Sequence, residues 1–131
     1  MRFFLDNCLP IRNARALHEM VKPEHSFTHL QDKFLANTKD EVWIRTLGNE
    51  GGWVVISGDY RIGKSAHERQ AWHESGLTIF FLSKGWTNIT PLQQHSKLAS
   101  ILEKIIEGAE RAAAGSGFTV SVNGKIERVW P

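Results

Sequence analysis

Three aspartates are the residues of this 131-residue sequence best suited to carry chemistry. Asp6 and Asp59 each come at the end of a short apolar run, and Asp40 stands just before another apolar stretch. Three carboxylates brought together repel one another unless they bind a hard divalent cation, and ligation by oxygen alone is typical of Mg²⁺ or Mn²⁺. Such an ion lowers the pKa of bound water and holds a phosphodiester for attack. The candidate catalytic and metal-binding residues are therefore Asp6, Asp40 and Asp59.

Each of these aspartates also has an ordinary structural explanation. Asp6 could form an Asx turn before the next helix, Asp40 could suit a helix dipole, and Asp59 could belong to a turn. Taken singly, these explanations are the simpler ones. Two buried strands that both end in aspartate shift the balance toward one shared site.

The elements that would position the aspartates alternate along the chain. Apolar and alternating runs predict strands at 2–7, 25–30, 53–57 and 77–82, with helices between them. The longest helix is expected over 98–109, and Asn123-Gly124 predicts a C-terminal β-hairpin. This order predicts an α/β fold, a three-layer sandwich around a mainly parallel central sheet. Strand carboxyl ends and helix starts then meet at one edge of the sheet, where the aspartates are expected.

Two capping boxes are expected to begin helices. Thr38 pairs with Glu41 in the first, and Ser65 pairs with Glu68 in the second. Both glutamates are therefore assigned to capping rather than to metal binding. The first of these helices is expected to end at Gly48.

Two loops are expected to border the site, over residues 31–39 and 83–90. Asp32 in the first loop is either a fourth metal ligand or a solvated side chain. Trp86 in the second loop is a candidate for stacking on a base, whereas Trp43, Trp53 and Trp72 fall on core faces.

Three basic residues follow the predicted strand ends. Arg61 and Lys64 come soon after Asp59, and Lys84 lies in the next loop on the same side of the sheet. They are the candidate substrate-binding residues because positive charge is needed where a phosphate backbone lies. Ordinary exposed cations would give the same pattern.

Residues 58–65 (Gly-Asp-Tyr-Arg-Ile-Gly-Lys-Ser) also fit the phosphate-binding pattern of nucleotide hydrolases, between a strand and a helix. Tyr60, Arg61 and Ile62 are bulky for a loop that must wrap phosphate closely. The strand at 77–82 offers no aspartate for magnesium at its end. Nucleotide binding is therefore kept as a weaker alternative.

Composition limits the class of protein. The chain is expected to form a single domain over 1–131, and its net charge of +2 gives no general signal for nucleic acid. The single Cys8 suits a reducing compartment, and no apolar run is long enough for a membrane span. A cytoplasmic protein without a membrane anchor is expected.

Three segments carry a family resemblance. Phe-Leu-Asp-Asn-Cys-Leu-Pro (4–10), Asn-Thr-Lys-Asp-Glu-Val-Trp-Ile (37–44) and Val-Val-Ile-Ser-Gly-Asp (54–59) resemble the compact PIN-like domains, which include VapC-type toxins. The resemblance extends over about residues 2–82, and the order of the three motifs is its specific part.

The resemblance implies a magnesium- or manganese-dependent endoribonuclease, with Asp6, Asp40 and Asp59 as the metal-binding acids. Larger PIN domains have a fourth acidic position, for which Asp32 is the candidate. As a toxin the protein would cleave RNA and have a cognate antitoxin protein as its partner, and a homodimer is left open. A PIN-like module that binds a partner protein without catalysis is the alternative.

Overall fold

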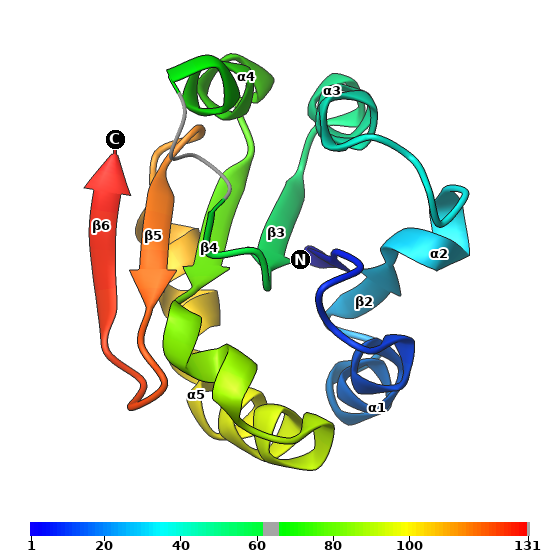
Figure 1. Cartoon of the computed structure of the whole chain (residues 1–131), viewed down its shortest axis with the longest axis vertical. Helices are drawn as coiled ribbons and strands as arrows, with labels where there is room; N and C mark the ends of the chain where they lie inside the picture. The colour runs from blue at the N-terminus through cyan, green and yellow to red at the C-terminus, as the bar shows by residue number, and fades with distance from the viewer. Residues whose placement is uncertain (62–65, 131) are drawn as a thin grey trace.

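The computed structural model describes residues 1–61 and 66–130. In these ranges the elements follow one another as β1 Arg2–Leu5, α1 Ile11–Val21, β2 Ser26–His29, α2 Leu30–Lys33, α3 Asp40–Glu50, β3 Trp53–Ser57, α4 Ala66–Ser75, β4 Thr78–Leu82, the 3₁₀ helix η1 Lys84–Asn88, α5 Pro91–Arg111, β5 Gly117–Val120 and β6 Ile126–Trp130 (Figure 1). None of the helices in the described ranges has the length and apolarity that a bilayer span requires.

The strands of the described residues form one six-stranded sheet in the order β2-β1-β3-β4-β5-β6. All neighbours run parallel except β5 and β6, which form an antiparallel hairpin. β1 lies inside the sheet, where Phe4 is in register with Thr28 of β2 and Val55 of β3. The chain goes from β1 to β2 and then returns to the other side of β1, so the strand order reverses between β1 and β3. The predicted α/β sandwich with a mainly parallel sheet is confirmed.

Helices cover both faces of the sheet (Figure 1). α1 and α5 pack on one face, and α3 and α4 pack on the other. The strands are apolar on both sides because both faces are buried. Phe3 faces the α1–α5 layer, and Phe4 faces the α3–α4 layer. Trp43 and Trp72 fill this second layer edge to face, 5.5 Å apart, which confirms their predicted place in the core.

The start of α3 differs from the expected capping box. The helix begins at Asp40, Lys39 takes the N-cap position, and no side chain caps it. Thr38 closes the preceding turn instead, because its backbone N–H donates to the Leu35 carbonyl at 3.0 Å. The expected pairing of Thr38 with Glu41 is therefore wrong, since the turn places Thr38 one residue too early to cap.

α3 also ends later than expected. It continues to Glu50, and Gly51 at φ +76° follows as the C-cap. Gly48 lies inside the helix, at the contact with α4. A Cβ atom there would come within 2.9 Å of the Ser75 carbonyl oxygen. Gly48 thus permits close packing of two helices rather than ending one.

Both expected loops contain helical turns. α2 begins at Leu30, just before the first loop, and extends into it to Lys33; it is held by a capping box of His29 and Asp32, which was missed because histidine is an uncommon N-cap residue. η1 occupies most of the second. The other expected capping box involves Ser65, which lies outside the described residues.

Candidate functional site

Asp6 immediately follows β1, at the point where the strand order reverses. Its side chain is buried, with 4% of the residue surface exposed. The Ser57 hydroxyl donates to Oδ2 at 2.5 Å, and the backbone N–H groups of Gly58 and Cys8 donate to Oδ1 at 3.1 and 3.2 Å. The end of β3 therefore fixes the carboxylate that follows β1.

Gly58 allows this close approach. A Cβ atom at Gly58 would lie 2.8 Å from the Cβ of Cys8, which is too short for two carbon atoms. A side chain there would push the loop after β3 away from the loop after β1. The hydrogen bond from Gly58 to Asp6 depends on that proximity.

The environment of Asp6 disfavours its charge. Burial raises the pKa of Asp6 to about 6, and the carboxylate of Asp40 adds to the rise. The hydrogen bonds from Ser57, Gly58 and Cys8 act in the opposite direction. Asp6 is thus a carboxylate whose ionised form has three donors but no cation beside it in the described residues.

Asp40 and Asp59 lie at the same edge of the sheet. Asp40 stands in the first turn of α3, and its Oδ1 accepts a hydrogen bond from the Trp43 indole at 3.0 Å. Asp59 follows β3, and its Oδ1 accepts from the backbone N–H of Arg61 at 2.9 Å and from the guanidinium Nε at 3.3 Å. Partial desolvation raises the pKa of Asp40, and the negative charge of Asp59 raises it further.

The pKa of the Cys8 thiol is affected by all three aspartates. Partial desolvation raises the pKa of its thiol to about 12, and the charges of Asp6, Asp59 and Asp40 each contribute to the rise. One atom therefore lies within electrostatic range of all three aspartates. The predicted convergence of strand ends and the α3 start agrees with this arrangement.

The donor chemistry of the three aspartates fits a hard divalent cation, since oxygen ligands and mutual repulsion both favour Mg²⁺ or Mn²⁺. Among the side chains that the structure describes, no group of three His, Cys, Asp or Glu is arranged closely enough to hold an ion. Asp40 and Asp59 each have one oxygen in a hydrogen bond, and the other has no partner within residues 1–61 and 66–130. The residues therefore fit the ion in chemistry without forming a closed ligand shell.

Both carboxylate oxygens of Asp32 have partners other than the three aspartates of the site. Its Oδ1 pairs with Arg15 at 2.8 Å, and its Oδ2 accepts from the His29 backbone N–H at 3.1 Å as part of the α2 cap. Glu68 instead influences the site directly, because its charge raises the pKa of Asp40. Glu68 was expected to cap the helix after β3, and its place in the first turn suits capping and metal binding equally, so the sequence alone did not distinguish the two.

The three predicted basic residues have different positions. Arg61 is 72% exposed and paired with Asp59. Lys84 is exposed at the start of η1. Lys64, like most of the phosphate-loop pattern after Arg61, lies outside the described residues.

A cleft of about 400 Å³ lies beside Asp59, between the loops after β1 and β3, η1 and the start of α5. Trp86 lines it but is only 2% exposed, and its indole Nε1 donates to the Val120 carbonyl at 3.0 Å. The expectation that Trp86 stacks on a base is therefore wrong. The 3₁₀ turn directs its ring into the core instead.

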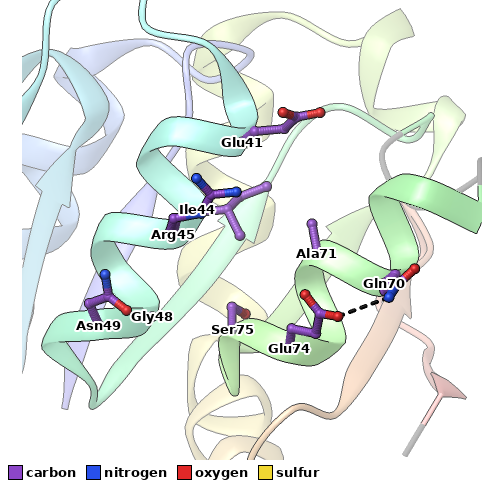
Figure 2. Close-up of a pocket in the computed structure, with 9 residues that line it drawn as sticks. All are labelled: Glu41, Ile44, Arg45, Gly48, Asn49, Gln70, Ala71, Glu74 and Ser75. Atoms are coloured by element: carbon purple, nitrogen blue, oxygen red, sulfur yellow. Dashed lines mark hydrogen bonds between the residues drawn. The ribbon is translucent and has the colours of Figure 1, made fainter.

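A second hollow, of about 490 Å³, lies between α3 and α4 and is polar (Figure 2). Glu41, Arg45 and Gln70 are among its lining residues, and Gln70 donates to Glu74 at 2.9 Å. Asp6 and Asp59 do not line it. The cleft beside Asp59 is thus the one that adjoins the carboxylate group.

The fold and the site define an α/β protein whose polar groups gather where the order of a mainly parallel sheet reverses, the usual ligand position in such sheets. A family model described as "PIN like domain" matches residues 1–84, more than half of the chain. The chain belongs to this PIN-like domain family. No match was found among curated proteins or among solved structures.

Membership of the family limits the possible functions of the chain. PIN-like domains are often nucleases, and they typically use divalent metal ions. The match is consistent with a nuclease, a hydrolase, and equally with a PIN-like module that binds another protein.

Proposed function

We propose that this protein is a Mg²⁺- or Mn²⁺-dependent endoribonuclease and the toxin of a toxin–antitoxin pair. The observation that carries the proposal is Asp6, a buried carboxylate at the reversal point of the sheet with Asp40 and Asp59 in electrostatic range. A carboxylate that is buried with hydrogen-bond donors but without a cation is costly to ionise, so Asp6 favours a function that uses its charge.

In this proposal the aspartates bind the ion and their neighbours orient them. Asp6, Asp40 and Asp59 hold the ion, and the bonds from Ser57 and Gly58 keep Asp6 in one orientation. The bound ion supplies Lewis-acid activation of water and neutralises charge on the phosphodiester.

The substrate is held by basic residues around the acidic group. Arg61, Lys64 and Lys84 bind the RNA backbone, and the Arg61 guanidinium shares its charge between Asp59 and phosphate. A cognate antitoxin protein would restrain the enzyme in the cytoplasm. The interaction-module alternative needs neither the ion nor the basic residues.

The decisive experiment is the substitution Asp6→Asn. The asparagine oxygen still accepts from the Gly58 and Cys8 backbone N–H groups, so the fold should persist, whereas the anionic ligand is lost. We expect Mn²⁺-dependent cleavage of short single-stranded RNAs to fall at least about 100-fold, and growth arrest on expression to disappear. Cleavage is measured by gel electrophoresis of end-labelled RNA.

Glu127→Gln serves as the control, since Glu127 is an exposed carboxylate on β6 that pairs with Lys125. This variant should cleave RNA as the wild type does. Undiminished cleavage by Asp6→Asn would show that the mechanism is wrong. A wild-type protein that neither cleaves RNA nor responds to Mn²⁺ would favour the interaction module.

A further inference from the structure

We propose that Asn7 is a positioning residue that holds the start of α3 in place, so that Asp40 stays near the ion that Asp6 binds. The proposal rests on the proposed function, because the place of Asp40 matters for an ion only if Asp40 is one of its ligands. Asn7 directly follows Asp6, and its side chain reaches the segment that leads to Asp40.

That segment, residues 35–39, has few attachments to the rest of the fold. It forms most of the connection between α2 and α3 (Figure 1), and 78% of the surface of Leu35 is exposed. Apart from α3, which follows directly, one hydrogen bond joins the segment to another part of the described chain. In that bond Asn7 Nδ2 donates to the Ala36 carbonyl at 2.6 Å. The place of the segment therefore depends on Asn7.

The start of α3 has no capping side chain of its own. Lys39 is the N-cap residue, and its side chain forms no capping hydrogen bond. The first turn of a helix that lacks a cap unwinds more easily, because its N–H groups have no partner within the helix. The Trp43 indole holds one oxygen of Asp40, but the backbone that carries Asp40 continues directly from the segment before it.

The side chain of Asn7 is fixed although the residue is exposed. A carbonyl can only accept a hydrogen bond, so the nitrogen end of the Asn7 amide faces Ala36. The other end, Oδ1, accepts from Gln31 Nε2 at 3.2 Å. Both ends of the amide thus have partners, and these partners lie on different sides of the α2–α3 connection.

The buried His29 side chain joins α2 to the loop after β1. His29 is 1% exposed, its Nδ1 accepts from the Gln31 backbone N–H at 3.1 Å, and its Nε2 donates to the Leu9 carbonyl at 2.7 Å. The Leu9 N–H donates in turn to the Asp6 carbonyl at 3.2 Å. α2 and the loop after β1 are thus fixed to each other, and Asn7 fixes the start of α3 to both.

The repulsion between two aspartates gives this contact its role. The negative charges of Asp6 and Asp40 repel each other, so without an ion they favour movement of the α3 start away from β1. The bond from Asn7 to Ala36 opposes that movement. Ligands that are already in place bind an ion with a smaller ordering cost.

The test is the substitution Asn7→Ala, which removes both amide bonds and adds no charge. We expect the affinity for Mn²⁺, measured by isothermal titration, to fall about tenfold. Amide hydrogen exchange at Val42 and Trp43, measured by NMR, should become at least about threefold faster. Both N–H groups donate to the Lys39 carbonyl in the first turn of α3, so they report whether that turn is formed.

Asn37→Ala is the matched control. Asn37 is an exposed asparagine of the same segment, and its side chain forms no hydrogen bond with the residues that the structure describes. This variant should keep the affinity for Mn²⁺ within about twofold of the wild type.

A second substitution tests whether Asn7 acts through the helix start. Lys39 has the extended conformation of an N-cap residue, with φ −67° and ψ 146°, so Lys39→Ser places a hydroxyl where it can accept from the first-turn N–H groups. With this cap, the start of α3 depends less on Asn7. Adding Asn7→Ala to the Lys39→Ser variant should therefore weaken Mn²⁺ binding no more than about twofold. Both proteins in that comparison lack the lysine charge.

The outcomes separate the role of Asn7 from the proposed function. A tenfold loss of affinity in both backgrounds would show that Asn7 acts on the ion directly, and would overturn the positioning role. Unchanged affinity or unchanged exchange in Asn7→Ala, with a wild type that binds Mn²⁺, would overturn it as well. A wild type that binds no Mn²⁺ would overturn the proposed function, and exchange at Val42 would then decide alone whether Asn7 holds the start of α3.

Discussion

At the scale of the residue, Asp6 combines strong hydrogen bonding with strong desolvation. Three donors stabilise its charge, yet burial outweighs them and raises the pKa to about 6. A residue selected only for stability would carry no charge in this position, because buried carboxylates without cations cost free energy. An ionised Asp6 therefore lowers the stability of the fold.

The raised pKa of Asp6 predicts that the stability of the fold depends on pH. The pKa of Asp6 rises from 3.8 to about 6 on folding, so between these values the folded protein keeps a proton that the unfolded chain has lost. The free energy of unfolding should fall as pH rises through this window and then level off. The contribution is about 3 kcal/mol, the product of the pKa shift and about 1.4 kcal/mol per unit.

Urea unfolding at pH 4 to 7.5 measures this contribution as the difference between the wild type and Asp6→Asn. The variant should gain relative stability as pH rises, and metal-free buffer is needed so that no ion compensates the charge. Parallel curves for the two proteins would contradict the prediction. Glu127→Gln, with its exposed carboxylate, should follow the wild type.

A second prediction concerns the fourth acid. Glu68 influences Asp40, whereas Asp32 is tied to Arg15 and to the α2 cap. We expect Glu68→Gln to weaken Mn²⁺ binding several-fold with little loss of stability, and Asp32→Asn to lower stability by about 1 kcal/mol with metal affinity retained. Isothermal titration with Mn²⁺ and thermal unfolding distinguish the two, and the reverse pattern would restore Asp32 as the fourth ligand.

At the scale of the element, the sequence predicted strands better than helix ends. β1, β3 and β4 are mainly apolar runs buried on both faces, and such runs can be recognised in the sequence without knowing which strands pair with them. Helix ends depend on single hydrogen bonds. Whether Thr38 caps a helix depends on the turn before it, which no local pattern specifies.

The caps allow a paired prediction. Thr90 accepts from the Gln93 N–H at 3.2 Å and Gln93 returns a bond to the Thr90 N–H, so this capping box at α5 is formed. Thr90→Ala should therefore cost about 1 kcal/mol in unfolding free energy, whereas Thr38→Ala should cost less than about 0.5 kcal/mol. Chemical denaturation measures both. A larger loss for Thr38→Ala would mean that the expected box forms after all.

The site was predictable to the same degree as the elements that carry it. Asp6 and Asp59 could be placed at one edge because strand ends in a parallel sheet converge. The cleft beside Asp59 could not be predicted, because η1 and the start of α5 line it from far along the chain. Nor could Glu68, because its helical position suits capping and metal binding equally.

At the scale of the whole molecule, the acidic group joins parts of the chain that are distant in sequence. Asp6 follows β1, Asp40 begins α3 and Asp59 follows β3, and all three positions exist only in the folded state. An ion that binds there therefore stabilises the fold by mass action. Mn²⁺ at about 100 times its dissociation constant should add about 2.7 kcal/mol to the free energy of unfolding.

Thermal unfolding with Mn²⁺ and with a chelator measures this stabilisation. The melting temperature should rise in the wild type and not in Asp6→Asn, while Glu127→Gln behaves as the wild type. Equal stabilisation of Asp6→Asn would place the ion elsewhere on the protein.

α3 and α4 pack closely against each other where Gly48 meets Ser75. Asp40 stands eight residues before Gly48 and Glu68 seven residues before Ser75, which places the acids about 12 and 10 Å along the two helices from that contact. If α3 rotated by about 5° about the Gly48–Ser75 contact, Asp40 at the start of the helix would move by about 1 Å. The distance between Asp40 and Glu68 thus depends on how closely Gly48 and Ser75 pack at the other ends of the two helices, and a larger residue at Gly48 would change that distance without altering either carboxylate.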